Sequence, residues 1–120
     1  MVQRVLSEKA LSATFAALAD PTRRAILARL AAGPAPVSAL TEPFRMSQPA
    51  ISRHLKVLER AGLISTARDA QRRPRRVEPK RVAEVSDWLE RYRQSLEANF
   101  ERLDALLEIM KLEQPRGESR

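Results

Sequence analysis

Apolar residues recur at alternating steps of three and four residues from Val82 to Met110, near the end of the chain. Such spacing places one continuous apolar stripe along an α-helix. It predicts a helix from Arg81 to about Glu113, roughly 30 residues and about 45 Å long. A chain of 120 residues cannot cover so long a stripe with its own surface. A helix folded back on its own domain would explain only the first two turns, so we expect a partner along the rest.

The preceding part of the chain carries the start signals of four shorter helices. Ser and Asp are preferred N-caps because their side-chain oxygens accept a hydrogen bond from the first turn. The predicted caps are Ser7, Asp20, Ser38 and Ser47, before helices that end near Ala19, Ala32, Phe44 and Ala61.

The pattern changes after the fourth helix. Gly62 suits the left-handed conformation that ends a helix. Residues 63–67 and 76–78 have β-forming side chains on either side of a basic turn, which predicts a β-hairpin. Residues 114–120 contain no large apolar side chain, so we expect a disordered tail there. The predicted fold class is therefore mainly helical with one small hairpin.

Positive charge is concentrated in one segment. The chain has 22 Lys+Arg against 15 Asp+Glu, a formal charge of +7. Residues 45–81 hold eleven of these bases and three of the acids, so this segment carries +8 and the remainder carries −1. A basic run is often only a solvated surface, but segregation this complete favours a face that binds a polyanion.

Composition excludes several classes of protein. The absence of Cys removes disulfide scaffolds, thiolate metal sites and cysteine nucleophiles. No apolar run approaches the roughly 18 residues of a membrane span. The first residues lack the apolar core of a secretory signal, so we expect a cytoplasmic protein. With a single His and no paired acids in a recognisable motif, we expect no enzyme.

The fourth predicted helix has two chemically different sides. Ile51, Leu55 and Leu58 share one side at helical spacing. Hydroxyl and cationic side chains occupy the other, which is typical of a helix that docks into the major groove of DNA; an ordinary amphipathic surface helix is the alternative. Arg53 is the candidate for a bidentate contact with guanine. The predicted DNA contacts are Ser47, Gln48, Pro49, Ser52, Arg53, His54, Lys56 and Arg60.

Two stretches of the chain resemble a known family. Residues 18–27 and residues 46–64, with the block Ser-Arg-His-Leu-Lys-Val-Leu and then Ala-Gly-Leu, are similar to the arsenic-repressor (ArsR/SmtB) family of bacterial winged helix-turn-helix regulators. The similarity extends over about residues 8–112. It implies four helices, a two-stranded hairpin and a fifth helix. Residues 1–113 would form a single DNA-binding and dimerisation domain.

The resemblance also implies roles for these elements. Residues 47–61 would be the recognition helix, and the hairpin would be the wing, with DNA contacts at Arg68, Arg72, Arg73, Arg75 and Arg76. These arginines either reach the minor groove or flanking phosphates, or form a mobile loop with only non-specific attraction. A homodimer would form through the first and last helices, at Leu11, Phe15, Trp88, Leu89, Tyr92, Leu96, Phe100, Leu103 and Leu107.

The chain departs from the family at the sensing residues. Founding members bind metals through Cys on the third helix, or His and carboxylates on the last helix, and neither set is present. We therefore expect no metal and no cofactor. His54 suits a structural hydrogen bond or a phosphate contact, because one His cannot supply a metal shell. The carboxylates of the last helix suit ion pairs with Arg91 and Arg93 on a solvated face; they are Asp87, Glu90, Asp104 and Glu108.

The expected function is that of a dimeric repressor that recognises a pseudo-palindromic operator in double-stranded DNA, within the bacterial nucleoid. The alternative is a basic architectural protein that binds DNA or RNA through charge and shape alone. How the repressor would be switched is open. The aromatic residues Phe15, Trp88, Tyr92 and Phe100 suit core or dimer packing, and binding of an unidentified small-molecule effector is the alternative. Asn99 interrupts the apolar stripe, and it either pairs across the dimer axis or faces solvent.

Overall fold

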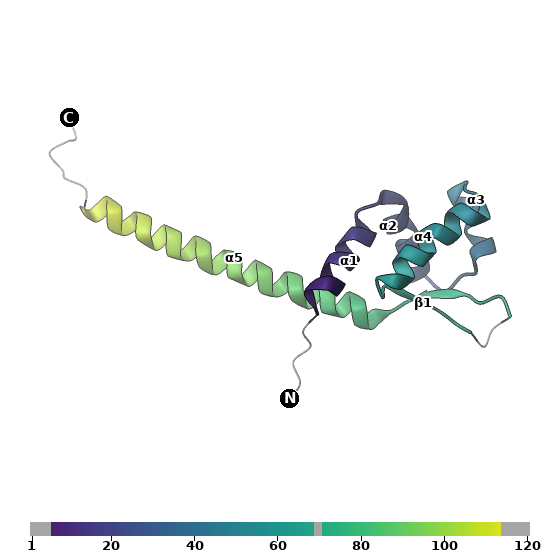
Figure 1. Cartoon of the computed structure of the whole chain (residues 1–120). Coiled ribbons are helices and arrows are strands. Elements are labelled where there is room, and N and C mark those ends of the chain that lie inside the picture. The colour runs from purple at the N-terminus through teal and green to yellow at the C-terminus, as the bar shows by residue number, and fades with distance from the viewer. Residues whose placement is uncertain (1–5, 69–70, 114–120) are drawn as a thin grey trace. The chain divides into compact units, whose positions relative to one another are not determined.

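The computed structural model describes residues 6–68 and 71–113, and its elements follow the predicted order (Figure 1). The chain is mainly helical with a two-stranded antiparallel hairpin, which confirms the predicted fold class. The expected tail, residues 114–120, lies outside the described residues. The elements are α1 (Glu8–Leu18), α2 (Pro21–Ala31), the 3₁₀-helix η1 (Val37–Ala39), α3 (Thr41–Phe44), α4 (Gln48–Arg60), β1 (Ile64–Thr66), β2 (Arg75–Val77) and α5 (Pro79–Glu113).

Contacts divide the chain into two units, with the boundary between Val85 and Ser86 inside α5. The first unit holds α1 to the first turns of α5, and the second holds the remainder of that helix. That residues 1–113 act as one domain stays a prediction.

Local sequence explains where three of the helices begin. The side chains of Ser7, Asp20 and Ser47 each accept a hydrogen bond from the backbone N–H three residues later, at 3.1, 2.9 and 3.3 Å. Gly62 follows α4 with a φ of +81°, a conformation that favours glycine. These three caps and the stop at Gly62 are confirmed.

The prediction of one helix over residues 39–44 with Ser38 as its cap is wrong. Ser38 lies inside η1, and α3 begins only at Thr41, with no side-chain cap. Pro43 supplies the reason. In a helix that begins at Ala39, the fifth residue must donate its N–H to the first carbonyl, and Pro43 has none. In a helix that begins at Thr41, the first four N–H groups need no partner.

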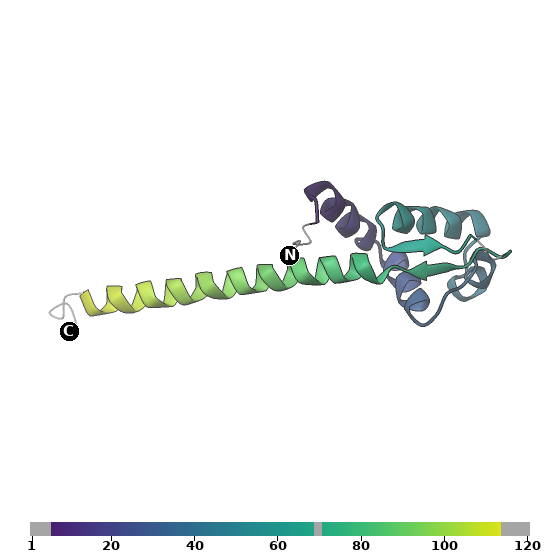
Figure 2. The same ribbon diagram turned by 90° about the horizontal axis from the view of Figure 1, so that it is seen from below.

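The core of the first unit lies between the helices and the hairpin. β1 packs on α4 and β2 packs on α2 (Figure 2). The register of the two strands pairs Ile64 with Val77. Ala35, in the link after α2, bonds the free edge of β2 through its N–H and C=O to Arg75, at 3.0 and 2.8 Å. Strand β2 is therefore bonded on both of its edges. The largest fully buried side chains are Ile26, Leu40, Ile51, Leu55, Leu58, Leu63, Ile64 and Thr14.

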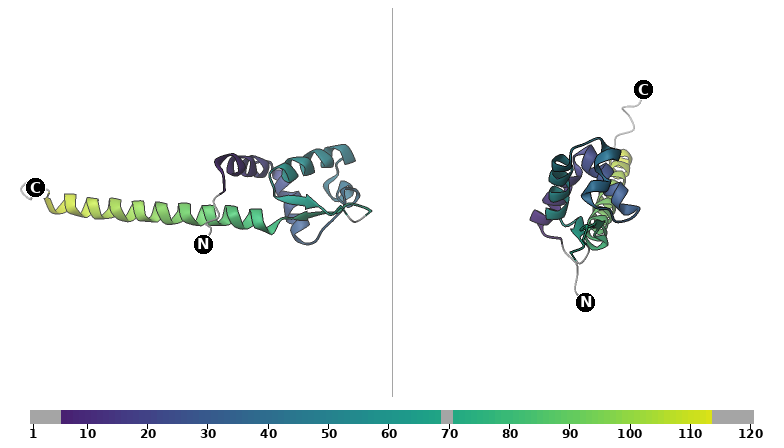
Figure 3. Two further views of the ribbon diagram at one scale, coloured as in Figure 1. Left: turned by 60° about the horizontal axis from the view of Figure 1, so that its bottom comes forward. Right: turned by 90° about the vertical axis from the view of Figure 1, so that its right-hand side faces the viewer.

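α5 is one continuous helix of 35 residues (Figure 3). It begins at Pro79, slightly earlier than predicted, because proline suits the first turn of a helix. Val85 is its one buried residue, whereas the large apolar side chains from Leu89 to Leu112 are 37–83 % exposed in the single chain. No helix within the described residues is both long and apolar enough to cross a membrane.

Candidate nucleic-acid interface

The two sides of α4 differ as the sequence predicts. Ile51, Leu55 and Leu58 are at most 2 % exposed and belong to the core. Within residues 6–68 and 71–113, the cations on the other side form no ion pair with a carboxylate. α4 thus presents hydroxyl groups and uncompensated positive charge to solvent. The exposed residues at its start and along this side are Ser47, Gln48, Pro49, Ser52, Arg53, Lys56 and Arg60.

A tight turn joins α3 to α4. Arg45 has a left-handed backbone, with a φ of +54°. Its N–H donates to the carbonyl of Glu42, and the N–H of Met46 donates to the carbonyl of Thr41, both at 3.1 Å. These bonds satisfy the last carbonyls of α3, and Phe44 and Met46 pack against the core. The pair α3–α4 therefore has the geometry of a helix-turn-helix with α4 as its second helix.

His54 lies at the flank of α4 and faces the protein. Its side chain is 21 % exposed. Nδ1 lies 3.4 Å from Nη1 of Arg23 and 3.9 Å from the carboxylate of Asp20. Both neighbours of Nδ1 belong to the start of α2, so these contacts lie within the protein. They support a structural role for His54, and contact with DNA stays a prediction.

A hollow of about 250 Å³ lies where the wing meets η1 and the start of α4. Arg72 donates from Nη2 to the hydroxyl of Ser38 at 3.2 Å, and Arg75 donates from Nη1 to the carbonyl of Arg73 at 2.9 Å. Nε of Arg75 is buried and has no hydrogen-bond partner among residues 6–68 and 71–113. None of the described residues that line the hollow carries a carboxylate, so this lining favours an anion beside the N-terminus of α4. Its lining is Pro36, Val37, Ser38, Gln48, Gln71, Arg72, Arg73 and Arg75.

The other predicted wing residues are spread along the hairpin. Arg68 and Arg76 are exposed. Arg76 lies 3.8 Å from the carboxylate of Glu78, which offsets part of its charge. Three of the five predicted wing arginines therefore line the hollow, and Arg68 and Arg76 lie outside its lining. Sequence reasoning missed two polar residues there, Ser38 and Gln71, because nothing in their local pattern marks them as neighbours of the arginines.

The residues predicted for dimerisation differ in exposure. Leu11 is 6 % exposed, so its side chain lies within the protomer. Trp88 is half-buried and stacks on Tyr92, with 5.3 Å between ring centroids. Asn99 is exposed and accepts a hydrogen bond from Arg102 one turn later. An exposed apolar surface of this extent is typical of a protein–protein interface. The exposed members are Phe15, Leu89, Tyr92, Leu96, Phe100, Leu103 and Leu107.

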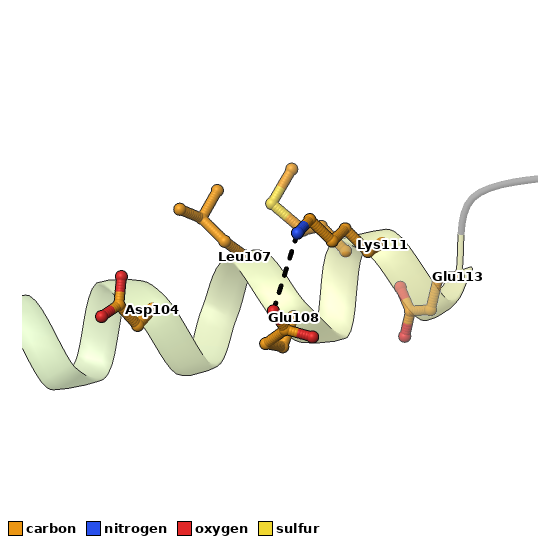
Figure 4. Close-up of a pocket in the computed structure, with 6 residues that line it drawn as sticks. Asp104, Leu107, Glu108, Lys111 and Glu113 are labelled. Atoms are coloured by element: carbon orange, nitrogen blue, oxygen red, sulfur yellow. Dashed lines mark ion pairs between the residues drawn. The ribbon is translucent and has the colours of Figure 1, made fainter.

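Four acids of α5 pair with bases of the same helix: Glu84, Glu90, Glu97 and Glu108. Of the predicted pairs, Glu90 with Arg93 is confirmed, and within residues 6–68 and 71–113 no ion pair forms at Asp87, Asp104 or Arg91. Arg93 bonds Glu90 at 2.6 Å and Glu97 at 2.5 Å, which lowers the pKa of Glu90 and raises that of Arg93. Lys111 lies 3.7 Å from Glu108 beside a hollow whose described lining residues are all on α5 (Figure 4). In the part of the chain that the structure describes, no three His, Asp or Glu residues gather as a metal site would need.

Comparison with known proteins connects this geometry to a family. A family model described as a helix-turn-helix domain matches residues 18–67. The HTH-type transcriptional regulator Rv2034 of Mycobacterium tuberculosis is 43 % identical over 76 residues, which are 63 % of this chain and 71 % of the relative. The transcriptional repressor SdpR of Bacillus subtilis is 44 % identical over 57 residues, 48 % of this chain and 63 % of SdpR.

A solved structure decides the assignment. The crystal structure of the ArsR family transcriptional regulator RHA00566 is 41 % identical, with a TM-score of 0.67, and the match covers 73 % of this chain and 97 % of that one. The chain belongs to the ArsR family. ArsR-family proteins are helix-turn-helix transcriptional regulators, a class of DNA-binding proteins and not of enzymes. In this ArsR-family chain, α4 is the second helix of the motif and the hairpin is the wing.

Proposed function

We propose that this ArsR-family chain is a homodimeric repressor that recognises a pseudo-palindromic DNA operator through α4. The observation that carries the proposal is the exposed set Ser52, Arg53 and Lys56 on a capped helix whose opposite side is fixed in the core. Such a helix enters the major groove with its polar side, and the buried anchors fix its orientation. The similarity to the repressor SdpR supports repression as the consequence of binding.

The apolar side of α5 supports the dimer. Its exposed side chains run over most of the helix, and a second copy of the same stripe is the partner that symmetry favours. Residues up to 113 then act as one DNA-binding and dimerisation domain. In the dimer, two copies of α4 would enter major grooves about 34 Å apart, one turn of the duplex.

The wing would contact phosphates that flank the major-groove site. Support comes from the hollow beside the start of α4, where Arg72, Arg73 and Arg75 meet and no described lining residue carries a carboxylate. A phosphate there would accept hydrogen bonds from the guanidinium groups and lie at the positive end of α4. Such contacts fix the register of the protein on DNA and read no sequence.

The proposal is tested by selecting genomic DNA fragments on the purified protein at about 150 mM salt, an ionic strength that screens non-specific attraction. Sequencing should recover a motif with two-fold symmetry and half-sites about 10 base pairs apart. The recovered duplex should bind on the order of a thousandfold more tightly than its base-shuffled version. If both duplexes bind equally, sequence-specific repression is wrong and the charge-only alternative replaces it.

Two substitutions on α4 separate reading of bases from contact with phosphates. Arg53→Ala should cost about 1–3 kcal/mol of discrimination and relax the preference at one base position of each half-site. Lys56→Ala, the matched loss of a neighbouring cation, should weaken binding to all sequences equally and lower the salt slope. Competition binding over single-base variants of the recovered duplex measures both effects. A uniform loss in both variants would argue against base reading by Arg53.

A further inference from the structure

Arg81 belongs to the basic segment of residues 45–81, but its guanidinium points into the protein. The side chain leaves the first turn of α5 and is 24 % exposed. Nη1 donates to the backbone carbonyl of Ala61 at 2.5 Å and lies 3.5 Å from the hydroxyl of Thr14. Nε donates to the carboxylate of Glu84 at 3.0 Å. One side chain therefore connects α1, the end of α4 and the start of α5.

Each polar group around Arg81 has a complementary partner. The carbonyl of Ala61 is at the end of α4, where a helix leaves its last carbonyls unpaired and its dipole attracts a cation. Thr14 is fully buried, and its hydroxyl donates to the carbonyl of Ala10 at 2.8 Å, which leaves the oxygen free to accept from Arg81. Glu84, 13 % exposed, balances the charge. The guanidinium thus fixes the end of α4 against α1.

Gly62 leaves the space that Arg81 occupies. A Cβ atom added at Gly62 would lie 2.9 Å from Cζ and Nη1 of Arg81, which is closer than real contacts allow. The glycine therefore has two reasons to be here: its left-handed backbone at φ +81° and the room that it leaves for the guanidinium.

We propose that Arg81 is a positioning residue for DNA recognition, which holds the end of α4 in the orientation that reads DNA while itself contacting no phosphate. The proposal rests on the proposed function of α4 as the recognition helix. It assigns Arg81 a different role from the wing arginines, although all of them contribute to the same basic segment. The salt dependence of binding distinguishes the two roles, because a residue that touches no phosphate releases no counterion.

The test compares Arg81→Gln with Arg72→Gln, a matched loss of one arginine from the wing. Two probes are used: the duplex recovered from genomic selection and its base-shuffled version. Arg81→Gln should weaken binding to the recovered duplex by about tenfold, with the same log–log salt slope and the same affinity for the shuffled duplex. Arg72→Gln should lower the slope by about 0.9 for each phosphate that the variant no longer neutralises, on both duplexes. Arg81→Lys should restore part of the affinity, because lysine can still donate to Ala61.

Hydrogen exchange gives a measurement that needs no DNA. The N–H groups of Gly62 and Leu63 donate to carbonyls of the last turn of α4 at 2.9 and 3.0 Å. They should exchange faster in Arg81→Gln and at the wild-type rate in Arg72→Gln. Gly62→Ala changes no charge, displaces the guanidinium and strains the backbone at φ +81°, so it should also weaken binding to the recovered duplex without changing the salt slope. The double variant should lose less affinity than the sum of the two single losses. If Arg81→Gln does not fold, Arg81→Lys carries the comparison.

Each outcome decides the role of Arg81. A lower salt slope in Arg81→Gln shows a direct phosphate contact and overturns the proposal, as does unchanged affinity for the recovered duplex. If selection recovers no preferred duplex, the proposed function of the chain has failed. In that case hydrogen exchange alone decides the role of Arg81. If Gly62 and Leu63 exchange at equal rates in Arg81→Gln and Arg72→Gln, Arg81 does not hold the end of α4.

Discussion

Some arginine side chains of this protein are exposed on the surface proposed to bind DNA, and others bond the backbone carbonyls at the ends of helices. Arg23 donates from Nε to the carbonyl of Ala17 at 2.7 Å and from Nη2 to that of Ala16 at 3.2 Å, at the end of α1. Arg81 does the same for Ala61 at the end of α4. A guanidinium suits this task because its five donors form a rigid fork. The net charge of residues 45–81 therefore overstates the positive charge available to DNA, because the guanidinium of Arg81 is bonded within the protein.

Asp20 gives a prediction about pH at this scale. The backbone N–H of Arg23 holds the pKa of Asp20 below its ordinary value, with a smaller contribution from His54. The folded state thus favours the carboxylate, and this stabilisation is present above the ordinary pKa and is lost as the pH falls through the folded one. Asp20→Asn keeps the cap and removes the charge. Its Tm should be below that of wild type at pH 7 at equal protein concentration, and the difference should shrink as the pH falls below the ordinary aspartate pKa of about 3.9. A difference in Tm that is constant with pH would contradict this linkage.

Whether a contact can be predicted from the sequence depends on how far apart its two residues are along the chain. The caps at Ser7, Asp20 and Ser47 depend on a donor three residues away, and the pattern predicted all of them. The contacts of Arg72 with Ser38 and of Arg81 with Ala61 join residues 34 and 20 positions apart. Only the packed fold brings these residues together. The polar side of α4 was therefore predictable from helical periodicity, whereas the hollow beside the wing was not.

At the scale of elements, short pieces are stabilised by their neighbours. Each strand of the wing has three residues, and such a hairpin is marginal by itself. Here β2 is bonded on one side to β1 and on the other to Ala35, and both strands pack on helices. α3 has four residues and is held between η1 and the turn at Arg45. The longer α4 has a buried side and its own N-cap, so its start can be tested separately.

Ser47→Ala should weaken the start of α4. The hydroxyl of Ser47 accepts from the N–H of Ala50 at 3.3 Å, and loss of such a cap costs about 1 kcal/mol. The free energy of unfolding, measured in urea at fixed protein concentration, should fall by this amount. Ser12→Ala is the matched control, because Ser12 is exposed inside α1 and alanine is the better helix former there. Equal destabilisation by both substitutions would rule out capping as the cause.

At the scale of the whole molecule, a single copy of the chain leaves the long apolar side of α5 exposed to solvent. Its apolar side chains remain exposed over about seven turns in the single chain, whereas four of its acids are paired with bases of the same helix. A helix surrounded by water would have ion pairs on its surface but no continuous apolar stripe. In the proposed dimer the charged side of α5 faces water and the apolar stripe lies between the protomers. The dimer then presents two recognition helices to DNA.

Leu96→Glu should therefore separate the protomers. Leu96 lies on the stripe, and a dimer would bury two unpaired carboxylates there at a cost of several kcal/mol. Sedimentation equilibrium should show a rise in the dimer dissociation constant of more than about a hundredfold. Gln94→Glu, which adds the same charge on the polar side of the same helix, should leave the dimer dissociation constant unchanged.

Loss of the dimer should also change DNA binding. Because one α4 reaches only one half-site, Leu96→Glu should lose affinity for the full operator while keeping wild-type affinity for an isolated half-site. A Leu96→Glu protein that remains dimeric would place the interface elsewhere, and the stripe of α5 would then have another partner.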